Sequence, residues 1–137
     1  MVSRDERHAR NQTVIDQLRA NGGKHDTMTL LILTTTGAKS GTPFTTPLAY
    51  QRDGDRLLVF ASNAGGPKHP DWYHNLVANP EVTVEVLGET FQALATTLVG
   101  DERDRFYAKQ AADSPVFGDY EKRTTRVIPV VALERIS

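Results

Sequence analysis

Short runs of apolar and β-branched residues recur along the chain and predict a protein built mainly from strands. They are rich in Val, Leu, Thr and Phe, which favour strands. The expected strands cover residues 30–36, 44–52, 56–62, 82–87, 90–99 and 126–134. Residues 30–33 and 57–61 are apolar on both faces, so we expect those two strands to be central. Six short strands in 137 residues predict a barrel or a sandwich.

Two glycine-containing pairs are predicted to form tight hairpin turns. Asp53-Gly54 separates the second and third expected strands, and Gly88-Glu89 separates the fourth and fifth. We expect these pairs to hold the positive φ angles that two-residue turns require. In the fourth expected strand, valines alternate with polar residues, which indicates one buried and one solvated face.

The first predicted helix covers residues 4–20 and is mostly polar. Its apolar stripe consists of Val14, Ile15 and Leu18, and Gly22-Gly23 follows as a stop signal. Such a thin stripe predicts weak packing. The helix is expected either to lie over the domain or to form a flap that faces a membrane or a substrate.

Two further helices are predicted between the strands. In "HPDWYHNLVANP", Pro70 suits a first helical turn, and aromatic and aliphatic residues pair at i,i+4 before Asn79-Pro80. In "GDERDRFYAKQAAD", Asp101 is a cap candidate, with Phe106 and Ala111 facing inward. We expect the acids at the start of this helix to complement its dipole rather than to act as acid and base.

Composition and length favour one globular domain over residues 1–137, with residues 1–24 as helix and lead-in. The net charge of −1 argues against a nucleic-acid partner, because such binders carry a basic excess or stripe. The absence of cysteine excludes disulfides and thiolate chemistry and agrees with a cytoplasmic location. No apolar run reaches the ~20 residues of a membrane span. Peripheral membrane contact through residues 4–20 stays open.

The loop after the first expected strand carries the parts of an anion site. Gly37 and Gly41 bracket Ala38-Lys39-Ser40, so backbone N–H groups, an ammonium and a hydroxyl can converge on one acceptor. A Walker A loop is excluded because Thr42, not lysine, follows the second glycine. A dinucleotide fingerprint is excluded because Pro43 and another strand follow instead of a helix. A plain turn remains the alternative.

Three segments together resemble the deazaflavin-dependent nitroreductase family. They are "LLILTTTGAKSGTPFTTPLAY", "DGDRLLVFASNAGGPKHPDWYHNLVANPEVTVEV" and "FGDYEKRTTRVIPVVAL", in that order and spacing. The resemblance covers about residues 10–136. It implies a six-stranded split β-barrel with peripheral helices, of the α+β class, related to the flavin-binding pyridoxamine phosphate oxidases.

The resemblance further implies a site for coenzyme F420, an 8-hydroxy-5-deazaflavin with a phosphate and an anionic tail. The loop would hold the phosphate and tail, the second strand would run along the ring, the end of the third would form the opposite wall, and Trp72 would lie against the ligand. The implied contacts are Ala38, Lys39, Ser40, Phe44, Thr45, Thr46, Pro47, Leu48, Ala49, Phe60, Ala61, Ser62, Asn63, Asp71, Trp72, Tyr73, His74 and Asn75.

The activity implied by the resemblance is hydride transfer from reduced F420 to a quinone-like or nitroaromatic acceptor. We expect Ser62 to hydrogen-bond the acceptor oxygen and Tyr120 to line the acceptor side, as the two catalytic residues. The family pattern carries basic residues at the positions of Ala38 and Asn63, so two cations are missing here. Lys68 or Arg52 could compensate.

Two alternatives stay open beside this hypothesis. FMN could replace the deazaflavin on the same barrel, although FMN would prefer more cations at its phosphate. The protein could also bind a deazaflavin or a lipid without catalysis.

No metal site is expected, since His69 and His74 lack a further ligand at helical spacing. A homodimer is expected from the architecture, because the edges and outer faces of such barrels need cover.

Overall fold

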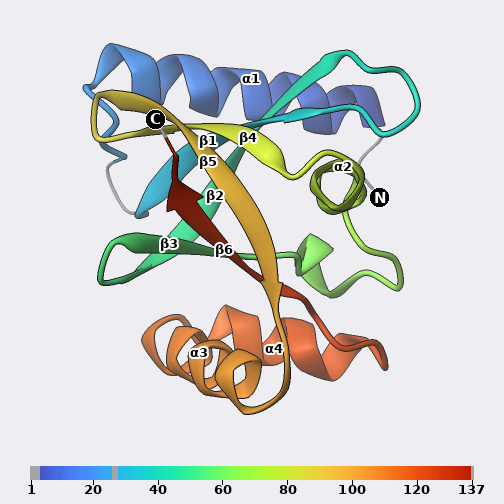
Figure 1. The fold of residues 1–137 in the computed structure, drawn as a ribbon. Coiled ribbons are helices and arrows are strands. Elements are labelled where there is room, and N and C mark those ends of the chain that lie inside the picture. The colour runs from blue at the N-terminus through green and yellow to red at the C-terminus, as the bar shows by residue number, and fades with distance from the viewer. Residues whose placement is uncertain (1–3, 26–27, 137) are drawn as a thin grey trace.

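Six antiparallel strands close into a barrel in the order β1-β2-β3-β6-β5-β4 (Figure 1). This computed structural model describes residues 4–25 and 28–136. Residues 1–3 of the expected lead-in lie outside the described part. The strands are β1 (Leu30–Thr36), β2 (Pro43–Asp53), β3 (Arg56–Phe60), β4 (Glu81–Val86), β5 (Glu89–Leu98) and β6 (Val130–Arg135).

Helices cover two opposite sides of the barrel and one of its openings (Figure 1). They are α1 (Arg4–Ala20), α2 (Asp71–Ala78), α3 (Gly100–Asp113) and α4 (Val116–Arg123), with a 3-10 turn η1 (Asn63–Gly65). In Figure 1, α1 lies along one side, and α3 and α4 lie along the other. Sequence patterns predicted α1, α2 and α3 but neither α4 nor η1.

Side chains at alternate strand positions fill the barrel interior. The buried cluster combines Leu31 and Leu33 of β1 with Val59 of β3, and Trp72 and Leu76 of α2 complete it. Full burial of one such Leu or Val side chain contributes about 1.5–3 kcal/mol. The i,i+4 pairing of Trp72 and Leu76 therefore anchors α2 to the barrel.

The thin apolar stripe of α1 is buried more completely than its composition suggests. Ile15 and Leu18 are 1% and 0% exposed, packed against Leu30 and Ile32 on the outer face of β1. These contacts occupy the apolar side of α1, so the expected membrane- or substrate-facing flap has no apolar face in residues 8–20 to carry it. Among the helices of the described residues, none is long and apolar enough to cross a membrane.

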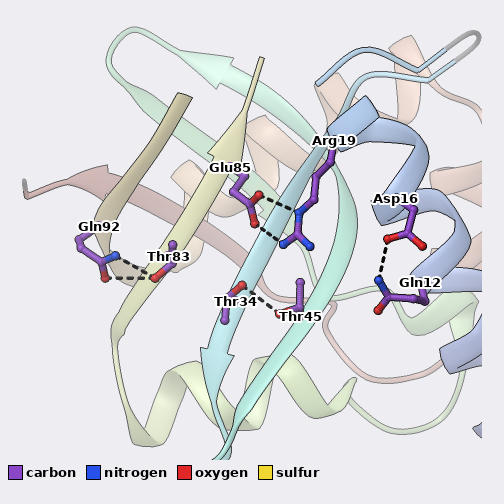
Figure 2. Close-up of polar contacts among 8 residues, drawn as sticks. All are labelled: Gln12, Asp16, Arg19, Thr34, Thr45, Thr83, Glu85 and Gln92. Atoms are coloured by element: carbon purple, nitrogen blue, oxygen red, sulfur yellow. Dashed lines mark hydrogen bonds and ion pairs between the residues drawn. The ribbon is translucent and has the colours of Figure 1, made fainter. Parts of the chain in front are cut away.

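An ion pair fixes the end of α1 to β4. The guanidinium of Arg19 makes two hydrogen bonds to the carboxylate of Glu85, at 3.0 and 2.9 Å (Figure 2). Gly23 then packs against the β4–β5 turn, where an added Cβ would lie 2.6 Å from the Cα of Leu87. Glycine at this position is therefore required by close approach as well as by its φ of 85°.

An aromatic cluster joins α3 and α4 to the opposite side of the barrel. Phe60 of β3 contacts the ring edges of Tyr107 and Phe117, with centroid separations of 6.0 and 5.7 Å. The hydroxyl of Tyr107 donates to the carbonyl of Phe117 over 2.6 Å, so α3 and α4 are also linked directly. Burial raises the pKa of Tyr107 to about 12.

Both predicted hairpin turns are displaced by one residue. Asp53 pairs with Arg56, so the β2–β3 turn is centred on Gly54 and Asp55, and of these two only Gly54 has a positive φ, at 58°. Val86 pairs with Glu89, which centres the β4–β5 turn on Leu87 and Gly88, at φ values of 48° and 82°. Inward burial of the strand residues fixed the register, and the turn followed it.

The last strand begins four residues later than the pattern predicted. β6 starts at Val130, whereas residues 126–129 form its irregular lead-in. Pro129 cannot donate a backbone hydrogen bond, although its carbonyl accepts from the N–H of Ala61 over 2.9 Å. The lead-in therefore contacts the end of β3 rather than extending the sheet.

Candidate functional site

The barrel is split where β2 and β3 part. β2 pairs with β3 only over Tyr50–Asp53, whereas its first half pairs with β1 alone. β3 instead follows β6, through the pair Phe60–Val130. Continued past its last pair, the register would set Ala49 opposite Phe60. The predicted ring-binding run 44–49 and the predicted opposite wall 60–63 thus start at the two sides of this split.

The first half of β2 offers an unpaired backbone edge at the split. The N–H of Tyr50 donates toward β1, to the carbonyl of Thr29 at 3.4 Å. Backbone groups of alternate residues in an antiparallel strand face opposite neighbours. Those of Thr45, Pro47 and Ala49 consequently face the split, where no strand of the described chain pairs with them. Such an edge can hydrogen-bond the polar rim of a planar ligand.

Side chains of the run 44–49 divide between two faces rather than facing one ligand together. Phe44 and Leu48 pack against the interior cluster, while Ala49 packs with α1. Thr46 is buried and aligned with Leu33 on β1. A ligand in the split therefore meets β2 through its backbone and only part of the predicted side chains.

The threonines before and after the loop brace the structure. The hydroxyls of Thr34 and Thr45 lie 3.1 Å apart on neighbouring strands (Figure 2). The buried hydroxyl of Thr35 accepts from the side-chain amide of Asn75 over 3.2 Å. Beside them, a polar cavity of about 590 Å³ opens on the outer face, lined by Thr34, Thr35, Thr36, Pro43, Asn79, Pro80, Glu81, Thr83 and Gln92. None of these lining residues is among the predicted cofactor contacts.

Some backbone donors of the glycine-flanked loop bond within the loop itself. The N–H of Gly37 donates to the carbonyl of Thr42 at 2.8 Å, and that of Gly41 donates back to Gly37 at 3.0 Å. The Ser40 hydroxyl lies 2.8 Å from that of Thr42 and so shapes the loop. Within the described chain, the N–H groups of Lys39 and Ser40 have no such partner. Of the backbone donors predicted for the anion site, these two N–H groups are the ones left to bind a ligand.

Lys39 supplies an uncompensated cation at this point. It is exposed, and no carboxylate of the described residues forms an ion pair with it. Arg52 lies nine residues beyond Pro43 on the same strand, a path of about 30 Å at ~3.3 Å per residue, so it is far along β2 from Ala38. Compensation by Lys68 or Arg52 stays a prediction.

Asn75 joins the loop to α2. Its side-chain oxygen accepts from the N–H of Ala38 over 3.0 Å, and its amide nitrogen donates to Thr35. Lys39 and Trp72 therefore belong to elements in direct contact, on the same side of the barrel. Trp72 itself is only 5% exposed and mostly contributes to the core. Its place against the ligand stays a prediction.

The remaining predicted residues of α2 differ in their surroundings. The hydroxyl of Tyr73 lies 3.2 Å from that of Thr97, so Tyr73 is held against β5. His74 is exposed, and its ring lies 5.8 Å from that of His69. Asp71 opens the helix and is exposed.

Among the described residues, no three His, Asp or Glu side chains gather as metal ligands.

The two predicted catalytic residues flank the η1 turn. The half-buried hydroxyl of Ser62 makes no hydrogen bond with any described residue. Tyr120 belongs to α4, which packs tightly on the turn: a Cβ on Gly65 would lie 3.0 Å from the Tyr120 carbonyl. The Tyr120 ring meets Phe117 edge-on at 5.4 Å. That the two hydroxyls meet a ligand stays a prediction.

Arg126 and His69 also meet at this turn, and neither was predicted as a site residue. Arg126 lies 2.8 Å from Nδ1 of His69 and donates to carbonyls of the turn. Burial, together with Arg126 and His74, lowers the pKa of His69. No sequence signal could have found this pair, because its acceptors are backbone carbonyls about sixty residues away.

Comparisons with known proteins show which family this chain is similar to. The family model for F420H(2)-dependent quinone reductase matches residues 8–135. An F420H(2)-dependent quinone reductase of Mycobacterium tuberculosis (strain ATCC 25618 / H37Rv) is 43% identical over 110 residues, which cover 77% of this chain and 72% of the relative.

Solved structures agree with the predicted fold. An F420-H2 dependent reductase, FDR-A, is 36% identical with a TM-score of 0.71, over 77% of this chain and 94% of its own. A structure titled as a domain-swapped dimer is 32% identical with a TM-score of 0.73, over 90% and 96%. A putative pyridoxamine 5'-phosphate oxidase from Listeria innocua, 15% identical with a TM-score of 0.58 over 90% and 94%, shares the fold.

The predicted split β-barrel with peripheral helices is confirmed, and so is the resemblance to F420-dependent reductases. The match spans nearly the whole chain and includes both sides of the split, the lysine-bearing loop and α2. This chain therefore belongs to the F420H(2)-dependent quinone reductase family.

Proposed function

We propose that this protein transfers a hydride from reduced coenzyme F420 to a quinone. The family match over residues 8–135 carries the proposal. The unpaired edge of β2 and the uncompensated Lys39 support it, because they suit a planar ring with a polar rim and an anionic tail. When bound in its reduced form, F420 supplies a hydride without single-electron steps.

In this proposal, the loop holds the anionic end of the cofactor. The ammonium of Lys39 and the backbone N–H groups of Lys39 and Ser40 donate to the phosphate and tail. Charge-assisted hydrogen bonds are roughly twice as strong as neutral ones, so Lys39 dominates this contact. Asn75 keeps the loop against α2 by accepting from Ala38.

The acceptor meets the other end of the split. Ser62 and Tyr120 each present a hydroxyl that makes no hydrogen bond with another described residue, so each can donate to the acceptor oxygen. Negative charge develops on that oxygen as the hydride arrives, and a positioned donor stabilises it. Nitroaromatic compounds, which also develop charge on oxygen, belong to the proposed acceptor class.

Titration of the purified protein with F420 and with FMN tests the cofactor. Trp72 is the only tryptophan, so its fluorescence reports binding near α2. Binding of F420 is expected; quenching by FMN alone would favour an FMN-dependent enzyme instead. Anaerobic mixing of bound, reduced F420 with a benzoquinone and with a nitroaromatic then tests turnover. Binding with no oxidation by either acceptor would leave a protein that binds the deazaflavin without catalysis.

A homodimer is a separate part of the proposal. It is supported by the 32%-identical structure titled as a domain-swapped dimer. Light scattering after size exclusion should give about twice the monomer mass of 15.2 kDa. A single species at the monomer mass would oppose the proposal.

A further inference from the structure

The turn at residues 62–65 is held in an unfavourable backbone conformation. Asn63, Ala64 and Gly65 follow one another at φ values of 47°, 52° and 78°. The left-handed conformation costs roughly 1–2 kcal/mol for each residue with a Cβ, so such a turn persists only where its surroundings hold it. Local bonds contribute, since the N–H of Gly65 donates to Ser62 at 2.9 Å and Asn63 donates to Lys68 at 3.0 Å.

Arg126 supplies the long-range support for this turn. Its Nε donates to the carbonyl of Gly66 at 3.1 Å, its Nη1 to that of Ala61 at 3.1 Å, and its Nη2 to that of Ser62 at 2.8 Å. A second Nη1 hydrogen reaches Nδ1 of His69 at 2.8 Å. Four of its five N–H groups are thus used, three on carbonyls at or beside the turn and one on His69.

The charge of Arg126 is not neutralised by an acid. All four acceptors are neutral, and in the described part of the chain no carboxylate lies within ion-pair distance. Burial lowers the pKa of this guanidinium, but arginine stays protonated in proteins. Arg19 and Arg56, in contrast, each pair with a carboxylate.

The contact with Arg126 determines where His69 carries its proton. A guanidinium can only donate, so Nδ1 of His69 must accept, and the neutral ring keeps its proton on Nε2. This Nε2–H has no hydrogen-bond partner among the residues the structure describes. The ring also meets Tyr73 at 4.9 Å, next to the predicted ligand contacts on α2.

We propose that Arg126 is a positioning residue for the acceptor end of the site. It fixes the turn that presents the Ser62 hydroxyl, and it holds His69 as the tautomer whose Nε2–H remains available as a second neutral donor. The effect on catalysis rests on the proposed function, whereas the effect on the turn and on His69 does not. The fork geometry, and not only the positive charge, carries this role.

The first test needs no cofactor. Long-range ¹H–¹⁵N NMR spectra of the wild-type protein, with His69→Asn to assign the signal, should show His69 protonated at Nε2 and bare at Nδ1 at neutral pH. In Arg126→Ala this fixed tautomer should be lost, and added guanidinium ion should restore it. A wild-type His69 protonated at Nδ1, or a signal unchanged in Arg126→Ala, would overturn the proposal.

The second test separates geometry from charge. Arg126→Lys keeps the charge but cannot span the three carbonyls, so kcat with a quinone should fall about tenfold to hundredfold while the Kd for F420 changes less than about threefold. Arg103→Lys is the matched control, because Arg103 also donates to the lead-in of β6, at the Ile128 carbonyl, but does not touch the turn. Wild-type kcat in Arg126→Lys, or an equal loss in both variants, would refute positioning by the fork. If neither F420 nor an acceptor reacts, the NMR test still decides the role of Arg126.

Discussion

The backbone N–H of Ala38 donates to Oδ1 of Asn75 over 3.0 Å, and this bond joins the lysine-bearing loop to α2. The same side chain donates to Thr35 at 3.2 Å, so one buried amide connects β1, the loop and the helix. The positions of Lys39 and Trp72 relative to each other consequently depend on Asn75.

Replacing Asn75 with alanine should destabilise the protein and weaken F420 binding together. The N–H of Ala38 and the hydroxyl of Thr35 lose their buried partner, which costs about 1–3 kcal/mol in the free energy of unfolding. Urea unfolding followed by Trp72 fluorescence measures this. Asn79→Ala, which removes one 3.4 Å bond to the Thr36 carbonyl, is the control and should cost less. Equal losses in the two variants would contradict the linking role.

Replacing Lys39 with alanine should weaken F420 binding without changing stability. A hydrogen bond to a charged group contributes about 1.5–3 kcal/mol, so Kd should rise roughly tenfold to 150-fold. The exposed Lys109 of α3 provides the control, and Lys109→Ala should bind F420 normally. An unchanged Kd in Lys39→Ala would remove this residue from the site.

Replacing Ser62 with alanine should reduce turnover and leave cofactor affinity nearly intact. A donor that acts on developing charge contributes up to about 10²-fold in kcat. Single-turnover oxidation of bound, reduced F420 by a quinone measures the step directly. Ser114→Ala, at the end of α3, should behave as wild type. Loss of F420 affinity with normal kcat would instead make Ser62 a cofactor-binding residue.

Replacing Leu87 with asparagine should stabilise the fold. Leu87 is 50% exposed and holds a φ of 48° in the β4–β5 turn, a conformation that costs a leucine roughly 1–2 kcal/mol. Asn-Gly is the preferred pair for such turns, so the midpoint of thermal unfolding should rise. Leu94→Asn changes a leucine of similar exposure (41%) inside regular β5 and should give no gain. A gain in both variants would show that exposure, not backbone strain, is the cause.

Stability should fall at alkaline pH because of Tyr107. Its pKa is about 12 in the folded protein, against 10 for an ordinary tyrosine, so the unfolded chain loses the proton first. The contribution of Tyr107 to the free energy of unfolding is therefore complete below pH 10 and is lost as pH rises from 10 toward 12. Between pH 8 and pH 11, the urea midpoint should fall less in Tyr107→Phe than in the wild-type protein. The same decline in both proteins would assign it to other groups.

The barrel could be predicted from sequence because its strands alternate. Val82, Val84 and Val86 all point into the interior cluster, as their spacing indicates. Turn positions were less predictable, because both tight turns lie one residue away from the predicted pairs. The strand alternation is kept, although it leaves Leu87 in a strained backbone conformation. Helix α4 was missed because Gly118 interrupts a stretch of only eight residues.

Some residues of the candidate site could be predicted from the sequence, and others could not. Lys39, Asn75 and Ser62 lie in motifs that the family resemblance carries, and the structure brings their segments to one side of the barrel. Arg126 could not be predicted, because it stood in an expected strand and its partners are main-chain atoms without a sequence signature. Long-range hydrogen bonds to carbonyls are determined by the completed fold alone.

The place of β6 between β3 and β5 has a consequence for biosynthesis. Until residues 130–135 have left the ribosome, both neighbouring strands expose an unpaired edge, and the emerging chain is open to association with other chains. Barrel closure is therefore a late event in synthesis. Chaperone contact should be greatest for nascent chains that stop just short of Val130.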